Sequence, residues 1–245
     1  MSGHSKWHNI QATKNKADAL RGKVFTKLGK EIAVAVKLGG PDPNSNATLR
    51  NVISKAKANN MPNDNIARSI KKASGESGGN NYESITYEGY GIGGSAIIVE
   101  CLTDNKNRTA GDIRHIFDKS GGSLGATGCV SYLFDRKGVI VIEKCADYNE
   151  DDILEWSLEA EADDVVTEEE VYQVYTSPAN FSAVREALEQ KNVKFLSANV
   201  EMIPQSYVDL DDDKYEKFKN MINTLEENDD VQDVYHNVND KEDEE

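Results

Sequence analysis

The sequence of 245 residues has few of the features that support disulfide frameworks, membrane insertion or secretion. Its three cysteines, Cys101, Cys129 and Cys145, are far apart and form no CxxC pair, so buried reduced thiols are the simplest interpretation. No apolar run approaches the roughly 18 residues that a membrane span requires. The N-terminal residues MSGHSKWHNI lack the apolar stretch of a secretion signal. We therefore expect a cytoplasmic protein that does not enter a membrane.

Acidic side chains are scarce near the N-terminus. Asp18 and Glu31 are the two acids among the first 41 residues, whereas eight Lys or Arg lie between Lys6 and Lys37. The first 75 residues hold 14 basic and 4 acidic side chains, a net charge of +10, and the remaining residues hold 14 and 39, a net charge of -25. This division favours a cationic module that binds a polyanion, joined to an acidic body, and argues against a uniformly acidic small-molecule enzyme.

Hydrophobic periodicity predicts a small helical bundle in residues 1–75. A short first helix is expected around residues 17–20, a clearer second helix over 21–38, a third helix capped by Asn46, and a fourth after Met61. Along the second helix the apolar side chains share one face, and the basic side chains share a narrow arc on the opposite face. The lysines on this arc are Lys23, Lys27, Lys30 and Lys37.

Strand patterns begin after a Gly/Ser-rich stretch at residues 74–81, which we interpret as an inter-domain connection. We expect strands at 82–88, 96–102 and 129–134, and a helix at 107–120. The stretch 137–204 has the order βαββαβ, which is ferredoxin-like. Within it, helices are expected to begin after Asn149 and at Pro178. Because the piece before it lacks elements to complete a sheet, a terminal helix and strand are expected to return to that piece.

The predicted fold class is therefore α+β, with an N-terminal small helical bundle followed by two α/β ferredoxin-like domains, one inserted in the other. The predicted domains are a basic helical domain at 1–75, an α+β domain at 76–136 plus 205–239, an inserted domain at 137–204 and an acidic tail at 240–245.

Several short motifs resemble catalytic or metal-binding signatures but lack their required context. GGSLG at 121–125 matches a nucleophile elbow, yet it follows a helix and precedes a strand, the reverse of the required order. The glycines at 89–94 fit no phosphate-binding register. His4 and His8 lack a third ligand nearby, and 209–213 lacks the glycine of a calcium loop. We predict no catalytic residues, no metal and no cofactor, with an enzyme as the weakest alternative.

Nucleic acid is the polyanion that we expect to bind the basic head. A run of lysines on a helix is usually a solvated face, but here acidic partners are not interleaved. On the N-terminal arm, an aromatic ring can stack on bases and ammonium groups can contact phosphates; a flexible polar arm is the alternative there. A smaller basic cluster extends this surface. The expected contact residues are Lys6, Trp7, His8, Lys14, Lys16, Arg21, Lys23, Lys27, Lys30, Lys37, Arg50, Lys55 and Lys57, and the smaller cluster comprises Lys106, Arg108, Arg114 and Lys119.

Six longer segments, in fixed order, resemble one known family. They are SGHSKW at 2–7, RGKVFTKL at 21–28, NMPNDNI at 60–66, YEGYG at 87–91, TDNKNRT at 103–109 and VSYLFDRKG at 130–138. The chain resembles the YebC family of bacterial proteins over residues 2 to about 240; this family includes a mitochondrial translational activator branch. Such long segments are far more specific than the short motifs.

The resemblance implies a three-domain protein without enzymatic activity, in which a helical domain precedes two α+β domains. It implies a DNA-binding transcriptional regulator, with a ribosome-associated translation factor that contacts rRNA as the alternative. Both require a basic head, and neither the lysine arc nor the arm groups Asn, Gln and Arg as a base-reading helix does. The expected partner is DNA or rRNA, with the ribosome as a further candidate, and a monomer is favoured.

Overall fold

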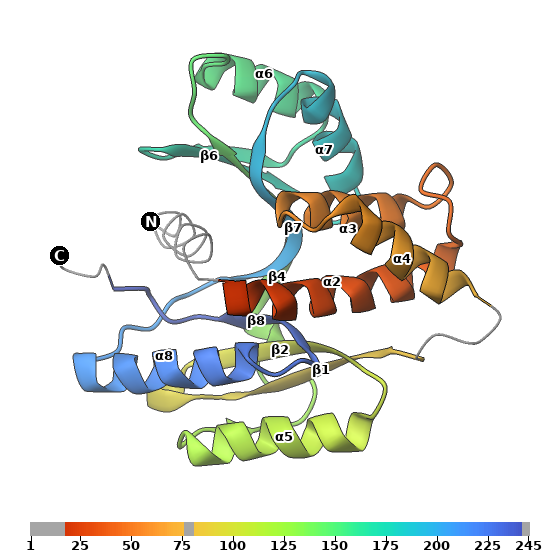
Figure 1. The fold of residues 1–245 in the computed structure, drawn as a ribbon. Helices are drawn as coiled ribbons and strands as arrows, with labels where there is room; N and C mark the ends of the chain where they lie inside the picture. Colours follow the sequence, from red (N-terminus) through yellow and green to blue (C-terminus); the bar gives the residue numbers. More distant parts are fainter. Residues whose placement is uncertain (1–17, 76–80, 242–245) are drawn as a thin grey trace. The chain divides into compact units, whose positions relative to one another are not determined.

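The computed structural model describes residues 18–75 and 81–241 (Figure 1). The chain forms two compact units, one spanning residues 17–134 and 204–239, and the other built on residues 135–203. Mixed helices and sheets confirm the predicted α+β class. Among the described residues, the structure contains no helix with the length and apolar character needed to cross a lipid bilayer.

Three helices form the N-terminal bundle: α2 (Asp18–Gly39), α3 (Ala47–Ala58) and α4 (Asn63–Ser74). The two helices expected before residue 39 are continuous from Asp18 onward, because each of the internal glycines Gly22 and Gly29 costs a helix only about 1 kcal/mol. Leu28, Ile32, Leu49 and Ile66 are buried in the core of the bundle.

Asn46 fixes the start of α3, as the sequence predicted. Its Oδ1 accepts a hydrogen bond from the backbone N–H of Leu49 at 3.0 Å. Its Nδ2 donates to the carbonyl oxygens of Ala35 and Gly40, both at 2.8 Å. A single buried side chain therefore caps α3 and joins it to the end of α2.

The first sheet has the strand order β3-β1-β2-β8, with each pair antiparallel. Its strands are β1 (Glu83–Tyr90), β2 (Ala96–Thr103), β3 (Ser123–Leu124) and β8 (Val231–His236). The pairing of β8 with β2 confirms that the terminal strand returns to this sheet.

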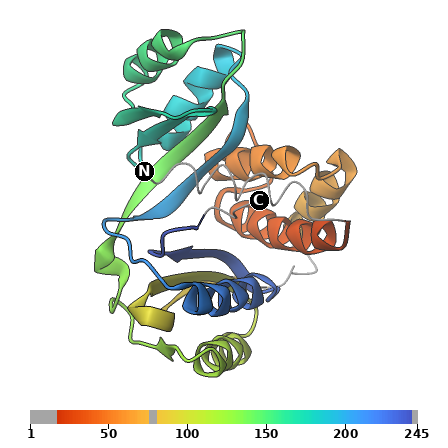
Figure 2. The same ribbon diagram turned by 90° about the vertical axis from the view of Figure 1, so that its left-hand side faces the viewer.

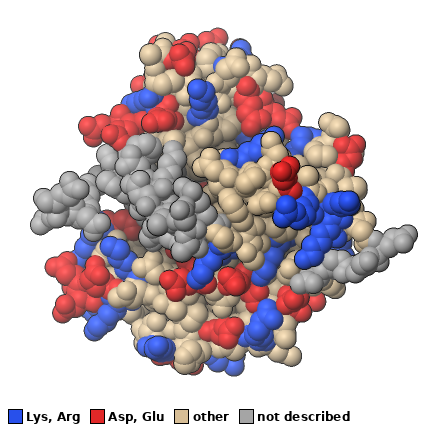
Figure 3. Space-filling view, in the orientation of Figure 1, with Lys and Arg blue, Asp and Glu red and all other residues tan. Residues whose placement is uncertain are grey.

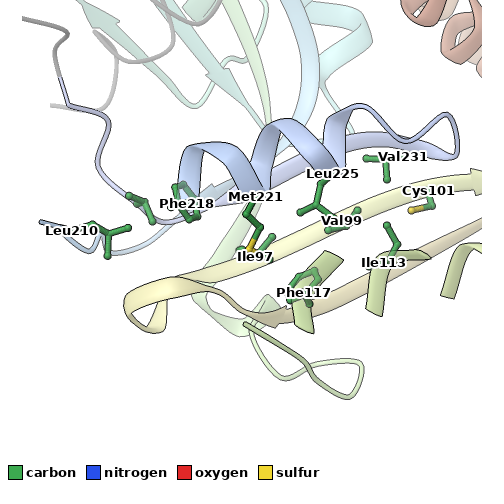
Figure 4. Packing of buried hydrophobic residues seen from close by; sticks show 11 residues of the cluster. Ile97, Val99, Cys101, Ile113, Phe117, Leu210, Phe218, Met221, Leu225 and Val231 are labelled. Carbon is green, nitrogen blue, oxygen red and sulfur yellow. The ribbon is translucent and has the colours of Figure 1, made fainter. Parts of the chain in front are cut away.

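Two helices, α5 (Lys106–Lys119) and α8 (Asp212–Glu226), pack against this first sheet. Alternate residues of β2 share a buried cluster with apolar residues of both helices, as Figure 4 shows. The members of this cluster that Figure 4 labels are Ile97, Val99, Cys101, Ile113, Phe117, Leu210, Phe218, Met221, Leu225 and Val231.

The segment after α5 corrects one strand assignment. Gly121 has φ +74° and lies just after the end of α5, so the GGSLG motif follows a helix. The strand expected at 129–134 is not formed; residues Ser131–Leu133 make a short 3-10 helix, and β4 runs from Phe134 to Glu143. Glu88 accounts for this difference, because its carboxylate accepts hydrogen bonds from the backbone N–H groups of Gly128, Val130 and Ser131.

The second sheet has the order β5-β6-β4-β7, which is the ferredoxin-like order for a βαββαβ chain. Besides β4 it contains β5 (Asp164–Thr167), β6 (Val171–Thr176) and β7 (Phe195–Pro204). Helices α6 (Glu150–Glu159) and α7 (Phe181–Gln190) cover one face of it (Figure 2). The bounds of the three predicted domains remain a prediction.

Helix starts in the second sheet's unit were predicted with mixed success. Asn149 caps α6 in a reciprocal capping box with Asp152, as expected. Helix α7 starts at Phe181, three residues after the expected Pro178, and residues 178–180 form a turn in which Ser177 Oγ accepts a hydrogen bond from the backbone N–H of Asn180 at 3.2 Å.

Candidate nucleic-acid interface

The lysine arc of α2 contacts the C-terminal end of α8. Lys23 Nζ donates to the carbonyl oxygen of Glu227 at 3.2 Å, and Lys27 Nζ donates to that of Glu226 at 2.8 Å. The last carbonyls of a helix lack intrahelical partners and carry the negative end of the helix dipole. These lysines therefore satisfy the end of a helix that lies about 200 residues away in the sequence.

Lys30 belongs to a buried polar cluster around Asp230. Its Nζ lies 2.7 Å from Asp230 Oδ1, and it also donates to the carbonyl oxygen of Asp229 at 2.7 Å. The other carboxylate oxygen of Asp230 accepts from Arg108 Nη2 at 2.7 Å and from Thr109 Oγ1 at 2.8 Å. Lys30 is 8% exposed and Asp230 is 5% exposed.

Electrostatics within this cluster favour the ionised form of Asp230. Burial raises the pKa of its carboxyl, but hydrogen bonds from Arg108, Lys30 and Thr109 outweigh burial and lower the pKa to about 2. Burial lowers the pKa of Lys27, against the opposing effect of Glu226 and two nearby aspartates.

The sequence around the end of α8 explains why lysines from another helix are needed. The helix has no basic residue in its last turn. Four acids, Glu226, Glu227, Asp229 and Asp230, lie within five residues there. Without cationic partners, these negative charges would interact unfavourably with the negative end of the helix dipole. The sequence suggested that the lysine arc of α2 is a surface for a polyanion. In the structure, Lys23, Lys27 and Lys30 of this arc instead have partners within the protein itself.

Three other predicted contact residues of the bundle also have internal partners. Lys55 pairs with the carboxylate of Glu31 at 2.9 Å. Arg50 donates to the carbonyl oxygen of Pro43 at 2.8 Å, and Lys37 donates to the side chain of Asn81. Lys57 is exposed, and the described part of the chain offers it no recorded partner.

The smaller basic cluster on α5 likewise contains some residues with internal partners and some without. Lys106 pairs with Glu83 at 2.5 Å, and Arg108 bridges Asp104 and Asp230. Arg114 and Lys119 are exposed, and within residues 18–75 and 81–241 neither has a recorded hydrogen bond or ion pair.

Helix α4 carries the basic face that the residue-level prediction omitted. Arg68, Lys71 and Lys72 lie at i, i+3 and i+4, opposite the packed side chains Ile66 and Ile70. All three are exposed, and none has a recorded partner in the part of the chain that the structure describes. Figure 3 shows Lys and Arg side chains gathered over the region of α3 and α4. The i, i+3, i+4 spacing was visible in the sequence and could have identified this face.

Part of the predicted site lies outside the described residues. Residues 1–17 include the predicted contact residues Lys6, Trp7, His8, Lys14 and Lys16, and also the pair His4 and His8 that was considered as a metal site. The side chain of Arg21 is not described either. Their roles stay predictions.

The motifs considered for metal or thiol chemistry have ordinary surroundings where they are described. Asp211 caps α8 by accepting a hydrogen bond from the backbone N–H of Lys214 at 2.9 Å. No group of three or more His, Cys, Asp or Glu in the described ranges could hold a metal ion. The three thiols are free, but Cys145 is exposed, so the expectation that all three are buried was wrong. Cys145 lies just after the end of β4 and forms an isolated β-bridge with Tyr148.

Comparison with known protein families places the whole described architecture in one class. The TACO1/YebC protein N-terminal domain model matches residues 5–76, and the TACO1/YebC second and third domain model matches residues 82–238. The chain belongs to the TACO1/YebC family, as the sequence resemblance indicated.

Curated relatives are similar over nearly the full chain. A probable transcriptional regulatory protein of Clostridium botulinum strain Okra is 59% identical over 238 residues, covering 97% of both chains. A protein of the same description from Acetivibrio thermocellus is 57% identical over 97% of this chain and 98% of its own. The crystal structure of a conserved hypothetical protein from Aquifex aeolicus is 46% identical and superposes with a TM-score of 0.82, covering 94% of this chain and 95% of that one.

Proposed function

We propose that this protein is a non-enzymatic regulatory protein that binds nucleic acid through its helical bundle, as a DNA-binding transcriptional regulator of the YebC type. The observation that carries the proposal is the basic face of α4. Arg68, Lys71 and Lys72 are exposed and lack recorded internal partners among the described residues. They are therefore available to neutralise phosphates, which dominate the affinity of proteins for nucleic acids.

The charge of the bundle supports a polyanionic ligand even though part of that charge is used internally. Residues 1–75 carry a net charge of +10. The contacts of Lys23, Lys27 and Lys30 with α8 and Asp230 stabilise the fold, so these residues would reach phosphates only if those contacts opened. The proposed surface accordingly centres on α4, with Lys57 and the N-terminal arm as extensions.

Lysines and arginines on a helix face position a nucleic acid more readily than they identify its sequence. A lysine ammonium is a compact charge without the planar fork that pairs with guanine edges. The two lysines of the α4 face should contact phosphates with little dependence on sequence. The regulatory role is supported by the description of the relatives from Clostridium botulinum and Acetivibrio thermocellus as probable transcriptional regulatory proteins.

Binding by the full chain to duplex DNA and to an rRNA hairpin, measured by fluorescence anisotropy, tests this function. The variant Arg68→Gln/Lys71→Gln/Lys72→Gln should weaken both ligands. Its matched control is Arg136→Gln/Lys194→Gln/Lys217→Gln, which removes the same charge from exposed positions outside the bundle. Equal losses in the two variants would show that net charge alone matters and would contradict the α4 site. Tighter binding of the rRNA hairpin than of duplex DNA would favour the translation-factor alternative.

A further inference from the structure

A hollow of about 210 Å³ opens beside the basic face of α4. Helix α2 lines it with Phe25 and Thr26, Met61 lines it from the turn before α4, and α4 itself contributes three side chains. Phe25 is half-buried and Met61 is 6% exposed. Phe25 and Met61 therefore expose only a small apolar surface in the hollow, next to the polar groups of α4.

The α4 wall of the hollow carries polar groups with unused hydrogen-bonding capacity. Asn65, Arg68 and Ser69 lie at i, i+3 and i+4, so their side chains share one stripe of the helix. Asn65 and Ser69 are half-buried. Among the residues that the structure describes, none of these three side chains has a recorded hydrogen bond or ion pair. Half-buried polar groups beside a small apolar surface are typical of a site that binds a small polar ring.

The size of the hollow restricts the ligand. Sites for drug-sized ligands occupy roughly 300–1,000 Å³, and this hollow of about 210 Å³ is smaller. It suits one planar ring system better than a whole nucleotide, whose sugar and phosphate would stay outside. An asparagine amide offers a donor and an acceptor side by side, which match those on the edge of a base.

Arg68 links the hollow to the surface that we propose for phosphates. Its guanidinium belongs to the exposed face with Lys71 and Lys72, and it also lines the hollow. A strand whose phosphates lie along α4 would therefore place its bases beside this opening. Bases inside a duplex are stacked and paired, whereas bases of a single strand can be splayed out onto aromatic side chains.

We infer that the hollow formed by Phe25, Met61, Asn65 and Ser69 receives one unpaired base of a single-stranded nucleic acid whose phosphates contact the α4 face. This inference rests on the proposed function. It adds a preference for single strands over duplexes, because an unpaired base can enter the hollow, whereas a base inside a duplex stays stacked and paired. The full chain should accordingly bind a single strand about tenfold more tightly than a duplex of equal length.

The experiment uses single-stranded RNA, single-stranded DNA and duplexes of one sequence, each with one 2-aminopurine. Binding is followed by anisotropy, and the environment of the base by 2-aminopurine fluorescence at saturating protein. Wild type should change the fluorescence of the single strands and leave that of the duplexes unchanged. Ser69→Leu, which fills the hollow, and Asn65→Ala, which removes the amide, should reduce the preference for single strands to less than twofold. The RNA and DNA arms show which strand is the better ligand.

Lys71→Gln is the matched control, because Lys71 lies on the α4 face but does not line the hollow. It should weaken single strands and duplexes by the same factor and keep the fluorescence change. If wild type binds no nucleic acid, the proposed function fails. If wild type binds single strands and duplexes equally, or if both hollow variants keep the preference, the base site is wrong while the function stands.

Discussion

The basic faces of α2 and α4 look equivalent in the sequence but have different surroundings. Lys23, Lys27 and Lys30 contact backbone carbonyls at the end of α8 and the carboxylate of Asp230. Arg68 and Lys71 on α4 have no recorded partner in the described chain. Cationic side chains on one face of a helix can therefore stabilise the fold or remain available to a ligand, and their charge alone does not distinguish the two roles.

The largest expected effect on the α2 side is produced by Asp230→Asn. Removing this charge leaves Lys30 buried without its counter-charge, and breaking a buried ion pair costs roughly 3–5 kcal/mol. Because asparagine keeps some of the hydrogen bonds, we expect the free energy of unfolding to fall by about 3 kcal/mol, as measured by urea denaturation.

Asp229→Asn is the control for this variant. Asp229 contacts Lys30 through its backbone carbonyl and not through its side chain, so its replacement should change the free energy of unfolding by less than about 0.5 kcal/mol. Equal effects of the two variants would mean that the Lys30–Asp230 pair contributes nothing specific to the fold.

The pH dependence of stability sharpens the same comparison. The pKa of Asp230 falls from an unfolded value of 3.8 to about 2 in the folded protein. A carboxyl whose pKa is lowered on folding stabilises the protein above its unfolded pKa, and this contribution disappears as pH falls through the folded pKa. Between about pH 4 and pH 2 the wild type should lose roughly 2 kcal/mol that Asp230→Asn does not lose. Parallel stability curves for the two proteins over this range would contradict the shift.

The contacts at the end of α8 should have intermediate effects. Lys23→Gln and Lys27→Gln each remove a cation that donates to a terminal carbonyl. We expect each to lower the free energy of unfolding by roughly 0.5–1 kcal/mol. Lys57→Gln, an exposed lysine without a recorded partner in the described residues, is the reference and should leave it unchanged. Thermal unfolding followed by circular dichroism measures the stability of all three variants. If Lys57→Gln were destabilised as much as the other two, the contacts of Lys23 and Lys27 with α8 would not explain their effect on stability.

The smallest expected change in stability belongs to the α4 face. Arg68→Gln, Lys71→Gln and Lys72→Gln remove charges from exposed positions, and such substitutions usually change stability by less than about 0.5 kcal/mol each. Loss of like-charge repulsion along one helix face partly offsets any cost. If the combined variant were destabilised by 2 kcal/mol in urea denaturation, α4 would have internal partners and would not be a free surface.

Local signals in the sequence predicted much of the fold. The cap at Asn46, the capping box at Asn149 and the βαββαβ order of residues 137–204 all depend on nearby residues, and each is present in the structure. The strand expected at 129–134 failed because Glu88, about 40 residues earlier, binds the backbone of that segment. Hydrophobic periodicity contains no information about such distant hydrogen bonds.

The candidate site was harder to predict for the same reason. The pattern of α2 showed that Lys23, Lys27 and Lys30 share one face, but it could not show that the acids near the end of α8 fold against that face. The hollow was equally invisible, because Phe25 and Asn65 are brought together by the packing of α2 on α4. The i, i+3, i+4 spacing of the basic residues on α4 was visible in the sequence, but these residues were not included among the predicted contacts.

The salt dependence of nucleic-acid binding most directly tests the central claim that α4, and not the α2 arc, presents the free cations. Affinities of the wild type, of Arg68→Gln/Lys71→Gln/Lys72→Gln and of Lys23→Gln/Lys27→Gln would be measured for one ligand across a series of salt concentrations. We predict that the α4 variant reduces the slope of log K against log salt by roughly 2–3, the value for three lost phosphate contacts, and that the α2 variant keeps the wild-type slope. A reduced slope in the α2 variant together with an unchanged slope in the α4 variant would contradict the account.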